Sequence, residues 1–308
     1  MSRGSSTGDD DVFVIEKGSV SVESGALRSP MFASEFGRYH FKPSDKWRVG
    51  FPYRPSADGL HLLSERDMRE TLPKTYRYLS EHQAALKRRK QFKEWFGYSA
   101  PRNLDLHDQA HIAVPVLADR GLFALIAPRF RGHLCPMASG GFTITLDPSS
   151  KVRAEYVLGL LNSKLLFWRL RKTSNVFRGG WITCTKQYFG ELPIRIIDLS
   201  TESDKSRHDQ MVKLVEHMQE MHKGLSAAKT PQEQTALQRR IAATDAQIDR
   251  LVYDLYDLTP EEIAVVETAV TPAVATAPGD PSQPSLAAEQ ARVETTQSYS
   301  AKEEPPER

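Results

Sequence analysis

The sequence predicts an α+β fold, in which a mixed α/β part is followed by a C-terminal helical hairpin and a disordered acidic tail. Three observations predict it. Short alternating apolar runs, typical of strands, mix with helical runs over residues 11–203. Apolar residues recur at helical spacing over 204–267, with a break near Pro231. Residues 268–308 are rich in Pro, Ala, Thr, Ser and Glu, a composition that buries too little apolar surface to order a chain.

The first elements follow from local patterns. Residues 1–10 are polar, and we expect them to be disordered. The mixed part then opens with a short strand, FVI. Residues 73–96 (PKTYRYLSEHQAALKRRKQFKEWF) predict one helix with Pro73 near its start and a weak apolar stripe. IAVPVL and LFALIA flank ADRG and predict a strand–turn–strand unit, and FTITLD predicts a half-buried strand.

The later elements are more apolar. EYVLGLLNSKLLFWRLRK predicts a second helix with few polar residues on its inner side. WITCTKQYFGELPIRIID predicts a strand, a turn and a second strand, in which Pro193 indicates an edge position. The apolar stripe of the hairpin contains Met211 and Met218. Such a stripe is more typical of core packing than of a special binding surface.

The charge of the chain is unevenly distributed. The net charge is only +2, but residues 254–308 hold 11 acidic and 3 basic side chains. Residues 74–102 hold 8 basic and 2 acidic side chains, and residues 151–195 hold 9 basic and 2 acidic ones. Such basic segments favour a polyanionic partner, although a solvated surface has the same composition. Composition alone leaves both interpretations open.

The sequence offers no catalytic motif. It contains no P-loop, GxGxxG turn, GxSxG elbow or HExxH helix. The pairs Gly140-Gly141 and Gly179-Gly180 lack the spacing of phosphate-binding loops and are typical of turns. We therefore predict no catalytic residue in this chain.

Metal-binding signals are weak as well. Cys135 and Cys184 are far apart, which excludes the usual four-ligand zinc site and predicts buried thiols in a reducing compartment. The run DLHDQAH brings together four potential ligands, but Pro101 and Asn103 precede it and a predicted strand follows. These neighbours favour a solvated loop, so we predict no metal site.

The polar start MSRGSSTGDDD lacks the apolar core of a signal peptide, and no run reaches the ~20 apolar residues of a membrane helix. We therefore expect a cytoplasmic protein with no membrane contact.

Six strings stand in a fixed order between about Ser6 and Glu267. They are STGDDDVFVI; LRSPMFASEFGRY with FPYR; LPKTYRYLSEHQAALKRR with Trp95; YVLGLLNSKLLFWRL; FRGGWITCTKQYFGELPI; and RLVYDLYDLTPEEIAVVE. In this order they resemble the TaqI-like C-terminal specificity domain, or target-recognition domain, of adenine-specific DNA methyltransferases. This domain recurs in type IIG and related restriction–modification proteins. Each string alone is weak, and the ordered set carries the resemblance.

The resemblance implies a module that docks double-stranded DNA, reads a short site and presents an adenine for methylation. Relatives place a methylase domain before this region, which binds S-adenosylmethionine and carries an Asn/Asp/Ser-Pro-Pro-aromatic motif. This sequence lacks that motif and the Gly-containing cofactor motif; its only Pro-Pro pair, Pro305-Pro306, lies among acidic residues. We expect S-adenosylmethionine on a methylase domain or on a subunit encoded upstream. A natural subunit, a split gene and a fragment of a longer enzyme all remain open.

Basic residues in two places are the candidate DNA contacts. Five cations in seven residues cannot share one helix face, so some of those in the predicted helix would be merely solvated. A glycine turn permits close approach of the backbone, and an arginine beside it can reach a guanine with two hydrogen bonds. The candidates are Lys87, Arg88, Lys90 and Lys93 in the predicted helix, Arg171, Lys172 and Arg178 near the Gly179-Gly180 turn, and Lys186 on the following strand.

Two other functions remain open. A complete methyltransferase or nuclease acting alone would need the cofactor and catalytic motifs that are missing. A type I-like specificity subunit would use its helices to assemble partners, but such subunits combine more than one recognition domain with helical spacers.

Overall fold

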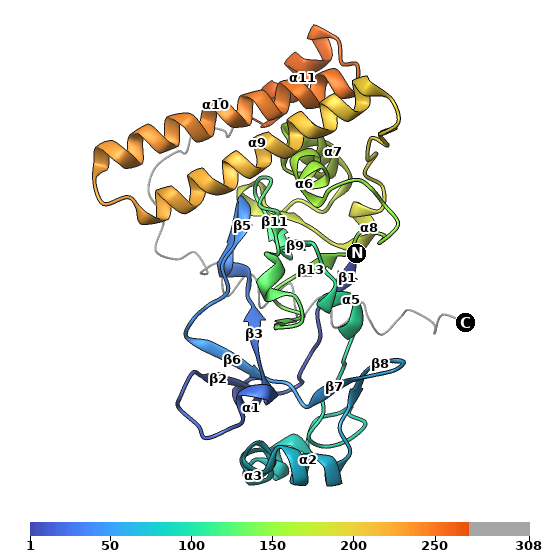
Figure 1. Cartoon of the computed structure of the whole chain (residues 1–308), viewed down its shortest axis with the longest axis vertical. Coiled ribbons are helices and arrows are strands. Elements are labelled where there is room, and N and C mark those ends of the chain that lie inside the picture. Colours follow the sequence, from blue (N-terminus) through green and yellow to red (C-terminus); the bar gives the residue numbers. More distant parts are fainter. Residues whose placement is uncertain (271–308) are drawn as a thin grey trace. The chain divides into compact units, whose positions relative to one another are not determined.

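Two mixed β-sheets precede the long helices in the computed structural model, which describes residues 1–270 apart from the side chains of Arg178 and Val270 (Figure 1). The larger sheet has the strand order β1-β13-β9-β11-β5-β4, and the smaller has the order β12-β3-β6-β2. β11 is parallel to β5 and β12 is parallel to β3, while the other neighbours are antiparallel. The predicted α+β class is therefore confirmed. The predicted tail, 268–308, lies outside the described residues except for its first three.

The bounds of the strands are as follows. The larger sheet contains β1 (Ser2–Arg3), β4 (Phe36–Gly37), β5 (Tyr39–Phe41), β9 (Ile112–Val114), β11 (Ala124–Leu125) and β13 (Phe142–Ile144). The smaller contains β2 (Val14–Glu16), β3 (Leu27–Met31), β6 (Trp47–Gly50) and β12 (Leu134–Pro136). Two separate antiparallel pairs are β7 (Tyr53–Ser56) with β8 (Gly59–Leu62), and β10 (Leu117–Ala118) with β14 (Ile182–Thr183).

The helices are mostly short before residue 200 and long after it. They are α1 (Asp10–Phe13), α2 (Glu65–Thr71), α3 (Pro73–Glu81), α4 (Gln83–Leu86), α5 (Leu104–Asp108), α6 (Ala154–Asn162), α7 (Lys164–Thr173), α8 (Lys186–Phe189), α9 (Glu202–Ala227), α10 (Pro231–Leu255) and α11 (Pro260–Val270). Short 3₁₀ turns are η1 (Ser24–Ala26), η2 (Ala33–Glu35), η3 (Pro128–Phe130) and η4 (Arg178–Gly180). Between residues 1 and 270, no helix has the length and apolarity needed to cross a bilayer.

The first ten residues are built into the fold, so the prediction that they are disordered is wrong. Ser2 and Arg3 pair with β13 at the edge of the larger sheet. Ser5 and Thr7 are 1% and 0% exposed. The Ser5 hydroxyl accepts a hydrogen bond from the backbone N–H of Arg102 at 3.0 Å. Small polar residues can be buried once their groups find such partners, and composition does not reveal those partners.

The helix predicted over residues 73–96 ends ten residues early. α3 and α4 are separated at His82, and the helical backbone stops after Leu86. The Leu86 carbonyl accepts a hydrogen bond from the side chain of Arg89 at 2.8 Å, which replaces a bond of the next helical turn. Trp95 is then buried beside Phe96. The apolar pattern continued past the helix because these two residues belong to the core, not to a helical face.

The helix predicted from EYVLGLLNSKLLFWRLRK is two helices. Ser163 is extended, with φ −66° and ψ 153°, and its hydroxyl accepts from the N–H of Leu166, so it ends α6 and begins α7. The preceding Asn162 is 1% exposed. Its side chain accepts from the N–H of Phe123 at 3.0 Å and donates to the Phe123 carbonyl at 2.9 Å. The Asn-Ser pair therefore turns the chain and ties α6 to the loop before β11.

The strand predicted after Pro193 is absent between residues 193 and 198. The Tyr256 hydroxyl donates to the Pro193 carbonyl at 2.5 Å and accepts from the Arg195 N–H at 3.0 Å. The Tyr256 side chain thus forms hydrogen bonds with backbone groups that would otherwise pair with a neighbouring strand. Ile196 is left 86% exposed.

The predicted helical hairpin is confirmed, and α11 follows it. α9 and α10 pack against each other, and α9 also packs on α6 and β5 (Figure 1). Met211, Met218 and Ile248 are fully buried, so the apolar stripe is core as predicted. The hairpin is also held by polar contacts with residues near β5. Arg38 pairs with Asp245 at 2.8 Å, and the Gln219 side chain donates to the Tyr39 carbonyl at 3.2 Å.

The contact between α6 and α9 depends on Gly159. A Cβ atom at Gly159 would lie 2.3 Å from the sulfur of Met211. We expect Gly159→Ala to destabilise the protein by about 1–2 kcal/mol, because overpacking outweighs the gain in helix propensity. Gly224, at the far end of α9, is the control, since its nearest neighbour would lie 3.6 Å away. Urea unfolding should show Gly224→Ala to be neutral or stabilising. Equal effects of the two substitutions would contradict this account.

Candidate nucleic-acid interface

The first predicted group of cations lies on a loop, not on a helix. Lys87, Arg88, Lys90 and Lys93 follow α4 in a stretch of turns and bends, and all four side chains are exposed. The expected helical arrangement is therefore wrong, because the helix ends at Leu86. Neighbouring cations on a helix must point to different faces of that helix. On a loop the cations are not subject to this restriction.

Arg89 differs from its neighbours. Its guanidinium donates to the backbone carbonyls of Thr7 at 2.5 Å, Gly97 at 2.9 Å and Trp95 at 2.5 Å, besides that of Leu86. Burial lowers the pKa of Arg89 from its ordinary value, while the more distant Asp9 opposes this. Arg89 thus fixes the loop to the N-terminal segment, and the other four cations remain at the surface.

The second predicted group surrounds the Gly179-Gly180 turn. Both glycines have positive φ, 78° and 81°, which favours glycine at these positions. A Cβ atom at Gly180 would lie 3.1 Å from a terminal nitrogen of Arg171, so the guanidinium rests on the bare backbone of the turn. Lys172 is the next residue of α7, and its side chain is exposed. The predicted turn is therefore present, with a basic side chain packed on it.

The remaining candidates lie in the same region. Lys186 is exposed and begins α8, so the prediction that it lies on a strand is wrong. α8 packs against α7, which carries Arg171 and Lys172. Burial, together with the charge of Lys186, lowers the pKa of the Met1 amino group. The backbone of Arg178 begins η4, but its side chain lies outside the part of the chain that the structure describes.

The two groups belong to different hydrophobic cores. The loop follows Leu86 and precedes Trp95, which pack in a core formed with the smaller sheet. α7 contributes Leu166 and Leu170 to a second core, which also contains the hairpin. In Figure 1 the loop belongs to the end of the fold that carries α3, away from α7 and α8. The structure therefore places Arg171, Lys172 and Lys186 on the packed helices α7 and α8 and leaves the loop apart.

The predicted DNA-binding cations with described side chains have no carboxylate partner among the described residues. Eight of the described arginines and lysines pair with carboxylates, as Arg28 does with Asp108 and Arg153 with Glu216, and most of the others do not. Within residues 1–270, no carboxylate lies at ion-pair distance from the predicted cations whose side chains are described. They are Lys87, Arg88, Lys90, Lys93, Arg171, Lys172 and Lys186. The described chain leaves their charge free for an external anion.

The run DLHDQAH is not a solvated loop, so that prediction is wrong. Its first four residues lie in α5, and His107 is 3% exposed. The Arg3 carbonyl, which can only accept, lies 3.0 Å from Nε2 of His107, so Nδ1 accepts from the Thr143 hydroxyl at 2.8 Å. Burial lowers the pKa of His107 to about 4. Asp108 forms a two-hydrogen-bond ion pair with Arg28.

His107 and Asp108 therefore serve the fold, and among residues 1–270 no group of three or more acidic, histidine or cysteine side chains converges as a metal site. Cys135 and Cys184 are buried free thiols, as predicted, and burial raises the pKa of each.

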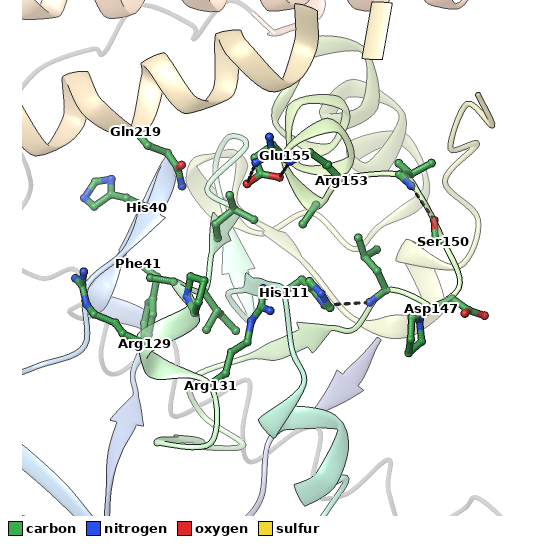
Figure 2. Close-up of a pocket in the computed structure, with 18 of the residues that line it drawn as sticks. His40, Phe41, His111, Arg129, Arg131, Asp147, Ser150, Arg153, Glu155 and Gln219 are labelled. Atoms are coloured by element: carbon green, nitrogen blue, oxygen red, sulfur yellow. Dashed lines mark hydrogen bonds and ion pairs between the residues drawn. The ribbon is translucent and has the colours of Figure 1, made fainter. Parts of the chain in front are cut away.

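A cavity of about 600 Å³ lies between the larger sheet and α9 (Figure 2). Its walls come from β5, from the segments around residues 125–131 and 146–155, and from α9. Its charged and histidine side chains include His40, His111, Arg129, Arg131, Arg153 and Lys223. Sequence reasoning missed this site, because its members are spread over more than 180 residues. The only local signal was the pair of arginines in PRFRG.

Comparison of the sequence with models of known protein families and with curated protein sequences gives no match.

Proposed function

We propose that this chain is a sequence-specific DNA-recognition module, of the TaqI-like target-recognition type, for an adenine-specific DNA methyltransferase of a restriction–modification system. The observation that carries this proposal is the set of seven cations without a carboxylate partner among the described residues. The order of sequence strings from Ser6 to Glu267 supports the family. Exposed cations that no carboxylate neutralises are suited to contacts with phosphates.

The two groups of cations suit two tasks. The loop side chains Lys87, Arg88, Lys90 and Lys93 are long and exposed, which suits contacts with phosphates that confer affinity without sequence choice. Arg171 is instead held on the Gly179-Gly180 turn, where a base edge can approach the bare backbone. Lys172 and Lys186 flank it as phosphate contacts, and Arg178 remains a candidate for base reading.

The chemistry belongs to another domain in this proposal. S-adenosylmethionine and the catalytic Pro-Pro motif reside on a methylase domain or subunit encoded upstream, because the sequence here carries neither motif. The recognition module supplies docking, orientation and site choice. The recognised site is found by mapping adenine methylation after co-expression with the upstream gene product.

The loop provides the direct test. We expect the triple variant Lys87→Ala, Arg88→Ala and Lys90→Ala to bind every duplex more weakly than the wild-type chain. Each lost phosphate contact should make the slope of log K against log salt shallower by about 1. Fluorescence anisotropy of a labelled duplex, titrated with the full chain at several salt concentrations, measures both quantities.

The matched control removes three cations that already have acidic partners. Lys46, Arg66 and Arg69 pair with Glu16, Glu70 and Glu65 at 3.9, 2.8 and 2.7 Å. Their triple replacement by Ala changes net charge equally, and we expect it to leave the salt slope near that of the wild type. If the wild-type chain retains no duplex even at low salt, alone or with the methylase subunit, the proposed function is wrong.

A further inference from the structure

The cavity between the larger sheet and α9 contains cations that the described chain does not neutralise. Within residues 1–270, Arg129, Arg131 and Lys223 have no carboxylate at ion-pair distance. The two acidic groups of the lining are already engaged. Glu155 pairs with Arg153 at 2.9 Å, and Asp147 accepts from the backbone and hydroxyl of the Ser149 turn. The cavity therefore has an excess of positive charge.

Arg131 is the least satisfied of these groups. Its Nε atom is buried, and no hydrogen-bond partner lies near it among the described residues. Figure 2 shows the Arg131 side chain extending toward His111, whereas Arg129 points to the side of His40. A buried donor without a partner is costly, and in native proteins such a group commonly meets a water, an ion or a ligand.

His111 presents a second donor at the same place. Its Nδ1 accepts from the backbone N–H of Leu146 at 3.3 Å, which leaves the proton of the neutral ring on Nε2. Burial, and then the neighbouring charge of Arg131, lowers the pKa of His111, which favours the neutral ring. A neutral donor beside a guanidinium is suited to an anion that has several acceptor oxygens.

Apolar side chains form much of the remaining lining, beside the polar His40, Ser150 and Gln219. Leu125, Leu146, Pro148 and Val152 line it, and Phe41 lies on the side of Arg129. The volume of about 600 Å³ is within the range of small-molecule sites and exceeds what a bare phosphate ion needs. This apolar wall suits a ligand with an organic part, and a free inorganic anion has no such part.

We propose that this cavity binds a phosphate ester whose organic part is apolar or aromatic. Arg131 and His111 hold the phosphate oxygens, Arg129 and Lys223 add positive charge at the rim, and the apolar wall contacts the organic group. This site does not depend on the proposed DNA-binding surface, which uses other residues.

Isothermal titration calorimetry of the full chain with adenosine monophosphate, inorganic phosphate and adenosine tests the proposal. We expect adenosine monophosphate to bind tightest and adenosine weakest. Arg131→Gln should weaken binding of adenosine monophosphate by about tenfold or more, as the loss of a charged hydrogen bond predicts. Arg169→Gln, at an exposed position of α7, is the matched control and should leave the affinity unchanged.

A thermal melt establishes that Arg131→Gln is folded. Lys223→Gln, at an exposed position of α9, provides a second variant and should weaken binding by a few-fold. The proposal is overturned if adenosine monophosphate shows no saturable binding at millimolar concentration, or if adenosine binds equally well. If a short duplex competes with adenosine monophosphate, the natural ligand is a phosphate of DNA. If the duplex does not compete, the ligand is a free phosphate ester. Saturable binding of adenosine monophosphate by a chain that retains no DNA would leave this site standing and remove the proposed function.

Discussion

Asn162→Asp is expected to lower the free energy of unfolding by about 3–5 kcal/mol at pH 7. Asn162 is 1% exposed, and its amide makes one donated and one accepted hydrogen bond with the backbone of Phe123. The substitution replaces the donating NH₂ group with an oxygen that faces the Phe123 carbonyl. It also places a charge in a buried position, where the neighbouring Arg38 already donates to the Asn162 carbonyl at 2.9 Å and pairs with Asp245.

The pH dependence of this variant has a definite sign. Burial raises the pKa of the new carboxyl in the folded state above its unfolded value of about 4. Near pH 4 and below, the carboxyl tends to be protonated in both states, and its hydroxyl can donate to the Phe123 carbonyl. Between pH 4 and 7 the unfolded state loses its proton first, so destabilisation relative to the wild type grows as pH rises. Urea unfolding at both pH values measures this growth.

Asn103→Asp is the matched control for this substitution. Asn103 is exposed and has φ 51°, a conformation that Asp tolerates. Its stability change should stay within about 0.5 kcal/mol at either pH. A destabilisation by Asn162→Asp that is equally small, or independent of pH, would show that the Phe123 contact does not hold α6 in place.

Arg89→Lys should destabilise the protein by about 2–3 kcal/mol although it conserves the charge. The guanidinium donates to four backbone carbonyls, from Thr7, Leu86, Trp95 and Gly97. An ammonium group is a point charge with three donors and cannot span this arrangement, so at least one carbonyl loses its partner.

Arg88→Lys at the neighbouring exposed position is the control and should change stability by less than about 0.5 kcal/mol. Chemical denaturation of both variants measures the two changes in the free energy of unfolding. Equal stabilities would mean that Arg89 is only a surface cation, like the residues on either side of it.

Periodic patterns made the class of the fold predictable. The apolar residues of the hairpin recur at helical spacing, and Met211, Met218 and Ile248 are fully buried as that spacing requires. FTITLD likewise contains β13, with Phe142 buried. Such patterns are local, and each long element offers enough repeats to be recognised.

Helix ends that depend on a single side-chain hydrogen bond were not predictable. Ser163 divides a helix because it caps the next one, and Arg89 ends α4 by taking a carbonyl; neither event alters the apolar period. The basic loop was therefore predicted as a helix. The cavity was missed for a similar reason, because His40, Arg131 and Lys223 meet only in the folded chain.

The contact of the hairpin with β5 joins parts of the chain that the ribosome makes at very different times. Arg38 and its partner Asp245 are 207 residues apart in the sequence. At a translation rate of about 5–20 residues per second, the ribosome needs roughly 10–40 s between the two. Throughout that interval the ring of Tyr39, which is 0% exposed in the finished protein, lacks the helices that cover it. The larger sheet therefore acquires its final cover on this side only after the hairpin has emerged.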